Sequence, residues 1–120
     1  MILEFTIPPS LNKLFAGYPK RHKSNEYEQW LKLASIELAS QTDYKIKWDE
    51  WLEINLTYFM PLYNQDWTKK TKDLDNYFKA LLDFLWDNIK WFKDKNIKVI
   101  KAEKKDSELN IVKIHINEIL

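Results

Sequence analysis

Apolar and polar residues alternate with a period of two in several segments of this chain, as they do in strands that bury one face. Four such segments are predicted as strands: Leu3–Ile7, Trp51–Phe59, Ile97–Lys104 and Leu109–Ile119. Pro8 and Pro9 end the first segment and Pro61 follows the second, since proline cannot continue a hydrogen-bonded ladder. The last two segments flank the polar turn 105–108, so we expect them to form a hairpin.

Two other segments repeat their apolar residues at intervals of three and four, which is typical of helices that bury one face. The first begins after Ser24, a good N-cap residue, and extends to about Ser40. Its apolar positions are Tyr27, Trp30, Leu31, Ala34 and Leu38. The second has apolar positions Leu74, Phe78, Leu81, Leu82, Leu85 and Ile89, with Asp75, Lys79, Asp83 and Asp87 along the opposite flank. The order β-α-β-α-β-β predicts an α+β fold with helices packed on a small mixed sheet, and we expect residues 1–120 to form one domain.

Composition restricts the chemistry that the chain can carry. There are no cysteines, which excludes disulfides, thiolate catalysis and zinc-thiolate sites. The two histidines, His22 and His115, are too few and too far apart in sequence for a histidine-based metal cluster. No basic, apolar N-terminal leader and no run of about 18 apolar residues occurs, so we expect a soluble, cytoplasmic protein with no membrane partner. Any bound metal must therefore be held by carboxylates.

Two aspartates at the start of the second predicted helix carry the strongest chemical signal. In an extended segment residues two apart point the same way, so Asp73 and Asp75 can share one cation, with Lys79 one helical turn beyond Asp75. A third carboxylate must come from a separate element, and Asp94 follows Asp75 by nineteen residues. Mg²⁺ prefers oxygen ligands and keeps several waters, so this pattern indicates a metal-dependent site for phosphodiester cleavage. The alternative is an N-capping acid and a surface ion pair, while Asp83 either contacts Lys79 or lies on a solvated helix face.

Basic residues cluster near these acids, although the formal net charge is only +1. They are Lys13, Lys20, Arg21 and Lys23 in the connector before the first helix, and Lys69, Lys70 and Lys72 before Asp73. Such cations would bind DNA and offset its repulsion by the carboxylates. Taken alone, lysine-rich segments are better explained as solvated loops, but their position beside the aspartate pair favours DNA binding. Trp67, just before the second cluster, is either a residue that touches DNA bases or a core or interface aromatic.

An Asp-x-Asp pair alone is a weak signal, but four features of this chain occur together. They are Pro8-Pro9-Ser10-Leu11-Asn12, the basic connector after it, Asp73-Leu74-Asp75-Asn76 followed by Lys79, and Trp91-Phe92-Lys93-Asp94-Lys95-Asn96-Ile97. Over nearly the whole chain this set resembles the RusA family of Holliday-junction resolvases. By that resemblance Asp73, Asp75 and Asp94 match the family's catalytic, metal-binding acids, and Lys79 matches its essential lysine. The chain departs from the family in two places: the family usually has an acid where Lys93 stands, and arginines where the lysines before Asp73 stand.

The resemblance implies a Mg²⁺-dependent, structure-specific endodeoxyribonuclease, with Mn²⁺ as an alternative ion. Such an enzyme resolves four-way junctions by paired strand cuts in DNA recombination and repair. It also implies a homodimer, because paired cuts in two strands related by twofold symmetry need two sites. The alternatives are a Mg²⁺ nuclease for other branched or flap DNA, and a protein that binds DNA structures without cutting. The intact acids disfavour the last, because simple phosphate binding would improve without them.

Overall fold

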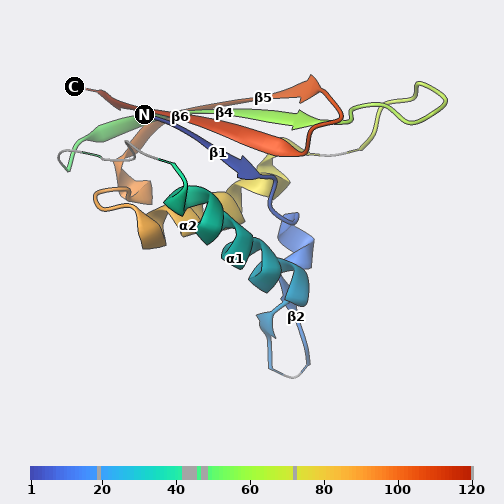
Figure 1. Cartoon of the computed structure of the whole chain (residues 1–120), viewed down its shortest axis with the longest axis horizontal. Helices are drawn as coiled ribbons and strands as arrows, with labels where there is room; N and C mark the ends of the chain where they lie inside the picture. The colour runs from blue at the N-terminus through green and yellow to red at the C-terminus, as the bar shows by residue number, and fades with distance from the viewer. Residues whose placement is uncertain (19, 42–45, 47–48, 72, 120) are drawn as a thin grey trace.

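The computed structural model describes residues 1–18, 20–41, 46, 49–71 and 73–119. Its strands are β1 (Ile2–Thr6), β2 (Phe15–Ala16), β3 (His22–Lys23), β4 (Trp51–Met60), β5 (Ile97–Asp106) and β6 (Ile111–Ile119). Its helices are α1 (Asn25–Ala39) and α2 (Phe78–Asn88), with 3₁₀ turns η1 (Leu11–Lys13), η2 (Leu74–Tyr77) and η3 (Asp94–Asn96). The fold is α+β, as the sequence predicts, with both helices against one face of a four-stranded sheet (Figure 1).

The sheet is mixed and has the strand order β1-β6-β4-β5. β6 pairs antiparallel with β1 and with β4, whereas β5 pairs parallel with β4. The parallel pair is joined through α2, because parallel neighbours need a crossover connection. β4 is central, and its alternate residues Leu52, Ile54, Leu56, Tyr58 and Met60 are all buried against the helices. The most apolar strand therefore lies between two neighbours, with the core on its helix side.

The expected hairpin of the last two strands is wrong. β5 and β6 are separated by β4, and each of them pairs with β4 instead of with the other. The connection between them crosses the end of β4, where the amide of Ser107 donates to the carbonyl of Met60 at 3.1 Å. A polar turn between two alternating segments is compatible with direct pairing of the two strands and also with a third strand between them. Insertion of β4 gives this apolar strand a ladder partner at each of its two edges, while the helices cover its buried face.

The first helix begins where its cap predicts. The hydroxyl of Ser24 accepts a hydrogen bond from the amide of Tyr27 at 3.1 Å, and the buried residues of α1 follow the expected stripe. Trp30 on that stripe donates its indole N–H to the carbonyl of Thr6 at 2.7 Å. The ring of Trp30 packs edge to face against the ring of Phe84 in α2, with 5.7 Å between the ring centres. Phe5 of β1 packs against the Phe84 ring in the same way, at 5.6 Å. These aromatic contacts hold both helices against β1.

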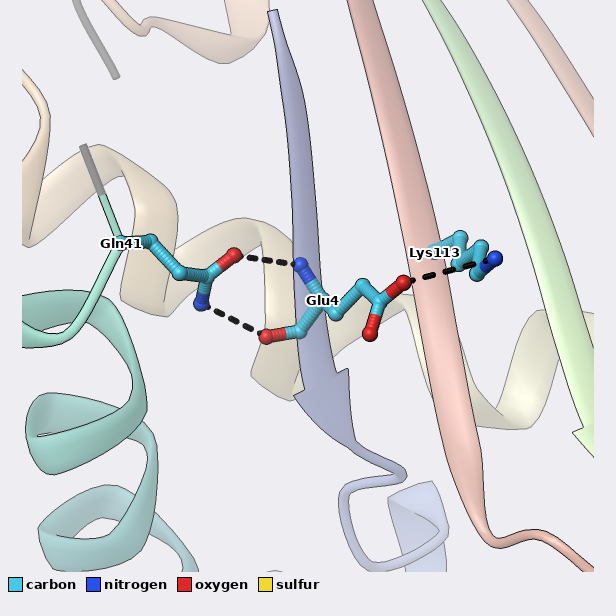
Figure 2. Close-up of polar contacts among 3 residues, drawn as sticks. All are labelled: Glu4, Gln41 and Lys113. Carbon is cyan, nitrogen blue, oxygen red and sulfur yellow. Dashed lines mark hydrogen bonds and ion pairs between the residues drawn. The ribbon is translucent and has the colours of Figure 1, made fainter. Parts of the chain in front are cut away.

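The outer edge of β1 is covered by side chains from the end of α1 (Figure 2). The amide group of Gln41 accepts from the backbone N–H of Glu4 at 2.7 Å and donates to its carbonyl at 2.8 Å. Glu37 accepts from the backbone N–H of Thr6, and the side chain of Glu4 pairs with Lys113 of β6 at 3.4 Å. Because these groups occupy the free ladder positions of an edge strand, a further strand cannot pair there.

Two projections leave the body of the molecule (Figure 1). The polar connector at residues 10–23, expected as a loop, contains η1 and a small antiparallel hairpin of β2 and β3 that extends beyond α1. The second projection is the segment after β4, where Tyr63 bridges Lys69. No helix in the described part of the chain is long and apolar enough to cross a membrane.

Candidate active site

The two aspartates of the central motif lie on a short turn that β4 holds in place. Asp73 precedes η2 in an extended conformation and Asp75 is inside η2. The turn is closed by the amide of Asn76, which donates to the carbonyl of Asp73 at 3.2 Å. Its last residue, Tyr77, accepts a hydrogen bond on its carbonyl from the hydroxyl of Tyr58 at 3.2 Å. Burial raises the pKa of that Tyr58 hydroxyl, so it remains a proton donor and fixes η2 against the core strand.

Asp73 and Asp75 are both exposed, and their carboxylates have no hydrogen-bond or ion-pair partner among the described residues. Asp73 stands at the N-cap position of η2, yet its side chain makes no capping hydrogen bond. Among the described residues, neither carboxylate takes part in a hydrogen bond or an ion pair. The two structural explanations, a capping acid and a surface ion pair, are therefore not observed for these residues. Their oxygen atoms are available for a ligand.

Lys79 pairs with Asp83 and not with Asp75. The expected single helix from Leu74 to Ile89 begins with the 3₁₀ turn η2, and α2 starts at Phe78. The Lys79 amine lies 3.1 Å from the Asp83 carboxylate, one turn further along α2. This contact confirms the first of the two roles considered for Asp83. Both side chains are partly exposed, so the pair keeps the amine close to the surface, where a phosphate group can reach it.

Asp94 lies at the start of η3 and shares an electrostatic environment with this pair. Partial burial and the negative charge of Asp83 raise the pKa of Asp94, and the positive charge of Lys79 acts in the opposite direction. The third expected acid is thus brought close enough to Lys79 and Asp83 for their charges to interact. The turn before it contains Trp91 with a φ of 71°, a left-handed conformation that is uncommon for a bulky residue.

Lys93, which stands where the family usually has an acid, is engaged away from Asp94. Its amine lies 3.9 Å from the carboxylate of Asp49 and above the ring of Trp91 at 5.3 Å. The same carboxylate accepts a hydrogen bond from the amide of Asn96, the one buried polar side chain among the described residues. Asp49 therefore holds η3 in place through Asn96 and pairs with the positive charge of Lys93. This pairing limits the effect on Asp94 of having a lysine, and not an acid, at position 93.

The proline motif is brought next to the aspartates. η1, which contains Leu11 and Asn12 of that motif, is in contact with η2 and with α2. Within the motif, Ser10 donates from its hydroxyl to the side-chain oxygen of Asn12 at 2.6 Å. At the last residue of η1, the carbonyl of Lys13 accepts a hydrogen bond from the hydroxyl of Ser24 at 2.6 Å, and this bond joins η1 to the start of α1. Segments that lie some sixty residues apart in sequence thus form one surface.

The expected DNA-binding residues divide between the two projections. Lys20, Arg21 and Lys23 are exposed on the β2–β3 hairpin, where the Arg21 guanidinium lies 5.0 Å from the centre of the Phe15 ring. Lys23 lines a cavity of about 310 Å³ together with Asp83 and Asp87, so the hairpin base adjoins the Lys79–Asp83 pair. Lys13 is exposed on η1.

The second basic group lies where the other projection returns to η2. Lys69 is exposed and Lys70 is half-buried, with its amide donating to the carbonyl of Leu62 at 2.8 Å. Lys72 lies outside the described residues. Trp67 is 79% exposed at the tip, with a φ of 66°, and its ring centre lies 6.1 Å from that of Tyr63. It is therefore not a core residue of this chain.

The chemistry of the three candidate acids suits a hard divalent cation, which prefers oxygen ligands. Asp73, Asp75 and Asp94 offer carboxylate oxygens, and the first two have no competing partner among the described residues. Within the described part of the chain, no three Asp, Glu or His side chains form a group that could hold a metal ion, so Asp73, Asp75 and Asp94 are not gathered around one point. An open site, in which few protein oxygens bind and waters or phosphate oxygens complete the shell, is the arrangement that suits Mg²⁺.

Sequence reasoning missed a second group of polar residues beside the aspartates. A cavity of about 390 Å³ opens between the proline motif, α1 and η2. Its polar lining includes Lys13, Glu26, Gln29, Tyr77 and Asn110. The only signal for it in the sequence was the Pro8–Ser10 motif, whose neighbours across the fold could not be known in advance.

Unpaired carboxylates beside a lysine, on a surface flanked by basic projections, are the features of a nuclease that cleaves a phosphodiester backbone. The family model for the endodeoxyribonuclease RusA matches residues 7–117, and this chain belongs to the RusA family. Its members are endodeoxyribonucleases that act on Holliday junctions, generally with a divalent metal ion. A comparison with curated proteins gave no match.

Proposed function

We propose that this chain is a Mg²⁺-dependent Holliday-junction resolvase that makes paired cuts in four-way DNA during recombination and repair in the cytoplasm. The observation that carries the proposal is the pair of exposed, unpartnered carboxylates of Asp73 and Asp75 on η2, next to Lys79. Membership of the RusA family supports the substrate class. A protein that only bound phosphates would gain nothing from such acids.

Asp73, Asp75 and Asp94 would hold the metal, with Mg²⁺ preferred and Mn²⁺ as a substitute. When bound, the ion would supply positive charge at the scissile phosphate and a position for the attacking water. Side chains of the protein would stabilise the rest of the charge that develops during cleavage. The exposed amine of Lys79 would donate to a phosphate oxygen as negative charge develops there, and the contact with Asp83 would orient that amine.

The basic residues would hold the DNA arms on either side of this site. Lys20, Arg21 and Lys23 belong to the β2–β3 hairpin, and Lys69 and Lys70 belong to the segment between β4 and η2, so they lie on two separate projections (Figure 1). Each phosphate contact releases counterions and strengthens binding without reading the sequence. Lys72 would extend the second group.

The active species would be a symmetric homodimer. A four-way junction has its own twofold symmetry, and paired cuts in opposed strands require two copies of the site related by that symmetry. Exposed aromatic residues offer apolar surface for such an interface, among them Trp51 and Trp86 at 49% and 50% exposure. Sedimentation with and without junction DNA tests this, since a monomer that still makes paired nicks would contradict it.

The decisive experiment offers the purified protein labelled four-way, flap, fork and duplex DNA with Mg²⁺, with Mn²⁺ or with EDTA. Symmetric nicks in the four-way junction that need the metal would support the proposal. Equal or faster cutting of flaps or forks would favour a nuclease for other branched DNA. Tight junction binding without any cleavage in either metal would favour a protein that binds DNA structures without cutting.

Mixed dimers of wild-type and Asp75→Asn chains test the pairing of the cuts. One intact site per dimer should nick one strand and leave the opposed strand whole. Dimers that still release two nicked products from a single binding event would mean that each chain cuts both strands.

A further inference from the structure

Two lysines flank Asp94 in the chain, and only one of them has a fixed partner among the described residues. Lys95 is exposed on η3, and its amine makes no contact with a described residue. The amine of Lys93 lies 3.9 Å from the carboxylate of Asp49 and 5.3 Å from the centre of the Trp91 ring. An ammonium group beside a carboxylate competes with any other cation for its oxygen atoms. The direction taken by the Lys93 side chain therefore affects what Asp94 can bind.

The two partners of Lys93 come from different parts of the chain. Asp49 lies in the segment before β4, and Trp91 lies in the turn between α2 and η3. The φ of 71° at Trp91 is a left-handed conformation, which a bulky residue adopts only at a cost in free energy. With this conformation Phe92 is buried in the core, while the Trp91 ring stays partly exposed and within reach of Lys93. A carboxylate and an aromatic face thus attract the same amine.

The position of Asp49 does not depend on Lys93 alone. Its carboxylate also accepts a hydrogen bond from the side-chain amide of Asn96, and Asn96 is buried. A buried amide needs a hydrogen-bond partner, so this contact holds Asp49 against η3. The backbone N–H of Asn96 donates to the carbonyl of Lys93 at 2.9 Å and closes the turn that carries Asp94. A partly exposed ion pair is weak by itself, but here the carboxylate is already in place before the amine binds.

We propose that Asp49 is a positioning residue for Asp94. Together with Trp91 it holds the amine of Lys93 away from the Asp94 carboxylate, and so keeps that carboxylate open to a cation. Without Asp49 the Lys93 side chain is free to rotate toward Asp94, which is the next residue in the chain. The inference rests on the proposed function only for the identity of the cation, a divalent metal ion.

The position of Lys93 can be tested by NMR without metal or DNA. Protons above an aromatic ring resonate upfield, so the methylene protons beside the Lys93 amine should be shifted upfield in the wild type and less so in Asp49→Asn. Lys90 is an internal control, because its amine lies 5.4 Å from the centre of the same Trp91 ring without a contact to Asp49. Its shift should persist in the variant. Unchanged Lys93 shifts, or equal losses at both lysines, would overturn the holding role of Asp49.

Binding of Mn²⁺ to the DNA-free protein tests the consequence for Asp94. At low ionic strength, titration calorimetry should show that Asp49→Asn weakens binding by about fivefold, because the released amine competes for the carboxylate. Lys93→Gln should recover that loss in the Asp49→Asn background and change the affinity of the wild type by about twofold or less. Equal effects of Lys93→Gln in the two backgrounds would mean that the charges act independently, and would overturn the proposal.

Matched variants separate the holding of Lys93 from net charge and from folding. Glu50→Gln removes the same charge from the next residue, which makes no contact with Lys93, and should weaken Mn²⁺ binding less than Asp49→Asn does. Lys95→Gln should have the same effect with and without Asp49, since Lys95 is not held. Asp49→Asn keeps an oxygen that accepts from Asn96, so its melting temperature should stay close to that of the wild type. Equal losses in Glu50→Gln and Asp49→Asn would contradict a specific role.

The role of Asp49 and the proposed function can fail separately. Both measurements use the protein without DNA, so the expected shifts and affinities in a protein that cuts no junction would support the role of Asp49 and refute the resolvase. Junction cutting together with unchanged Lys93 shifts in Asp49→Asn would refute the role of Asp49 and leave the resolvase standing. A wild-type protein that cuts junctions but binds no Mn²⁺ before DNA is added would also overturn the proposal.

Discussion

The amine of Lys79 lies 3.1 Å from the carboxylate of Asp83, so the lysine of the central motif is oriented by a residue one turn later in α2. An exposed pair of this spacing contributes only about 0.3–0.5 kcal/mol to stability. We therefore expect Lys79→Ala and Asp83→Ala to lower the melting temperature equally little. Lys79→Ala should lower the rate of junction cutting by about 10²–10³-fold, because it removes a donor to the transition state, and Asp83→Ala by about tenfold or less. Single-turnover kinetics measure both, and equal losses would mean that Lys79 acts only through the ion pair.

Each proposed metal ligand should be needed for cutting but not for binding. We expect Asp75→Asn to slow cutting by about 10³-fold or more, since metal catalysis supplies several kcal/mol and each 1.36 kcal/mol is tenfold in rate. Junction affinity should stay the same or rise, because the variant has one negative charge fewer near the phosphates. Asp73→Asn and Asp94→Asn should behave alike in cleavage and gel-shift assays. Near-normal cutting by Asp94→Asn would move the third ligand to Asp83, whose charge acts on Asp94.

Lysines before η2 should contribute to the salt dependence of DNA binding. Replacing Lys69 and Lys70 by Gln should reduce the slope of log K against log salt by about 0.9 for each phosphate that is no longer neutralised. The control replaces Lys101 and Lys113, which pair with Glu53 and Glu4 on the open face of the sheet. It changes the net charge equally. Equal slopes for the two double variants would show that Lys69 and Lys70 contribute to DNA binding only through the net charge, and not through their location before η2.

The tip of the second projection should respond to acid through Asp66. Hydrogen bonds from the hydroxyl and amide of Thr68 lower the pKa of the Asp66 carboxyl from its ordinary 3.8. Because the folded-state pKa is the lower one, this stabilisation of the tip is present above about pH 3.8 and is lost as the pH falls through the lowered pKa. Thr68→Val should raise the Asp66 pKa in an NMR titration. Thr71→Val, in the same segment, should leave it unchanged.

Gly17 should be required for the β2–β3 hairpin. Its φ is +99°, and a Cβ atom there would lie 2.6 Å from the ring of His22 and 2.7 Å from the carbonyl of Lys20. A non-glycine residue in a left-handed conformation costs about 1–2 kcal/mol, so Gly17→Ala should weaken junction binding roughly tenfold if the hairpin holds DNA. The melting temperature should change little, since the tip is exposed. Ala16→Ser, on the neighbouring strand residue, is the control, and unchanged affinity in both variants would remove the hairpin from the DNA-binding surface.

Sequence periodicity determined which segments become the four strands of the main sheet and the two α-helices, and which residues of β4 and α1 are buried. The alternation in β4 and the stripe from Tyr27 to Leu38 in α1 were both confirmed, because burial of one face requires that spacing whatever the neighbours are. The motif around Asp73 and Asp75 indicated the chemistry for a similar reason. Hard cations prefer oxygen ligands, and Asp and Glu are the residues whose side chains offer negatively charged oxygens.

Tertiary structure alone decided which elements are neighbours. The ladder groups of a strand are the same for every partner, so alternation in β5 and β6 could not reveal that β4 lies between them. The link between the proline motif and η2 and the engagement of Lys93 by Asp49 likewise depend on contacts between segments that packing brings together. The sequence offered the candidate acids and the lysine, whereas packing on the buried face of β4 determined which elements surround them, because Tyr58 of that face holds η2 through the carbonyl of Tyr77.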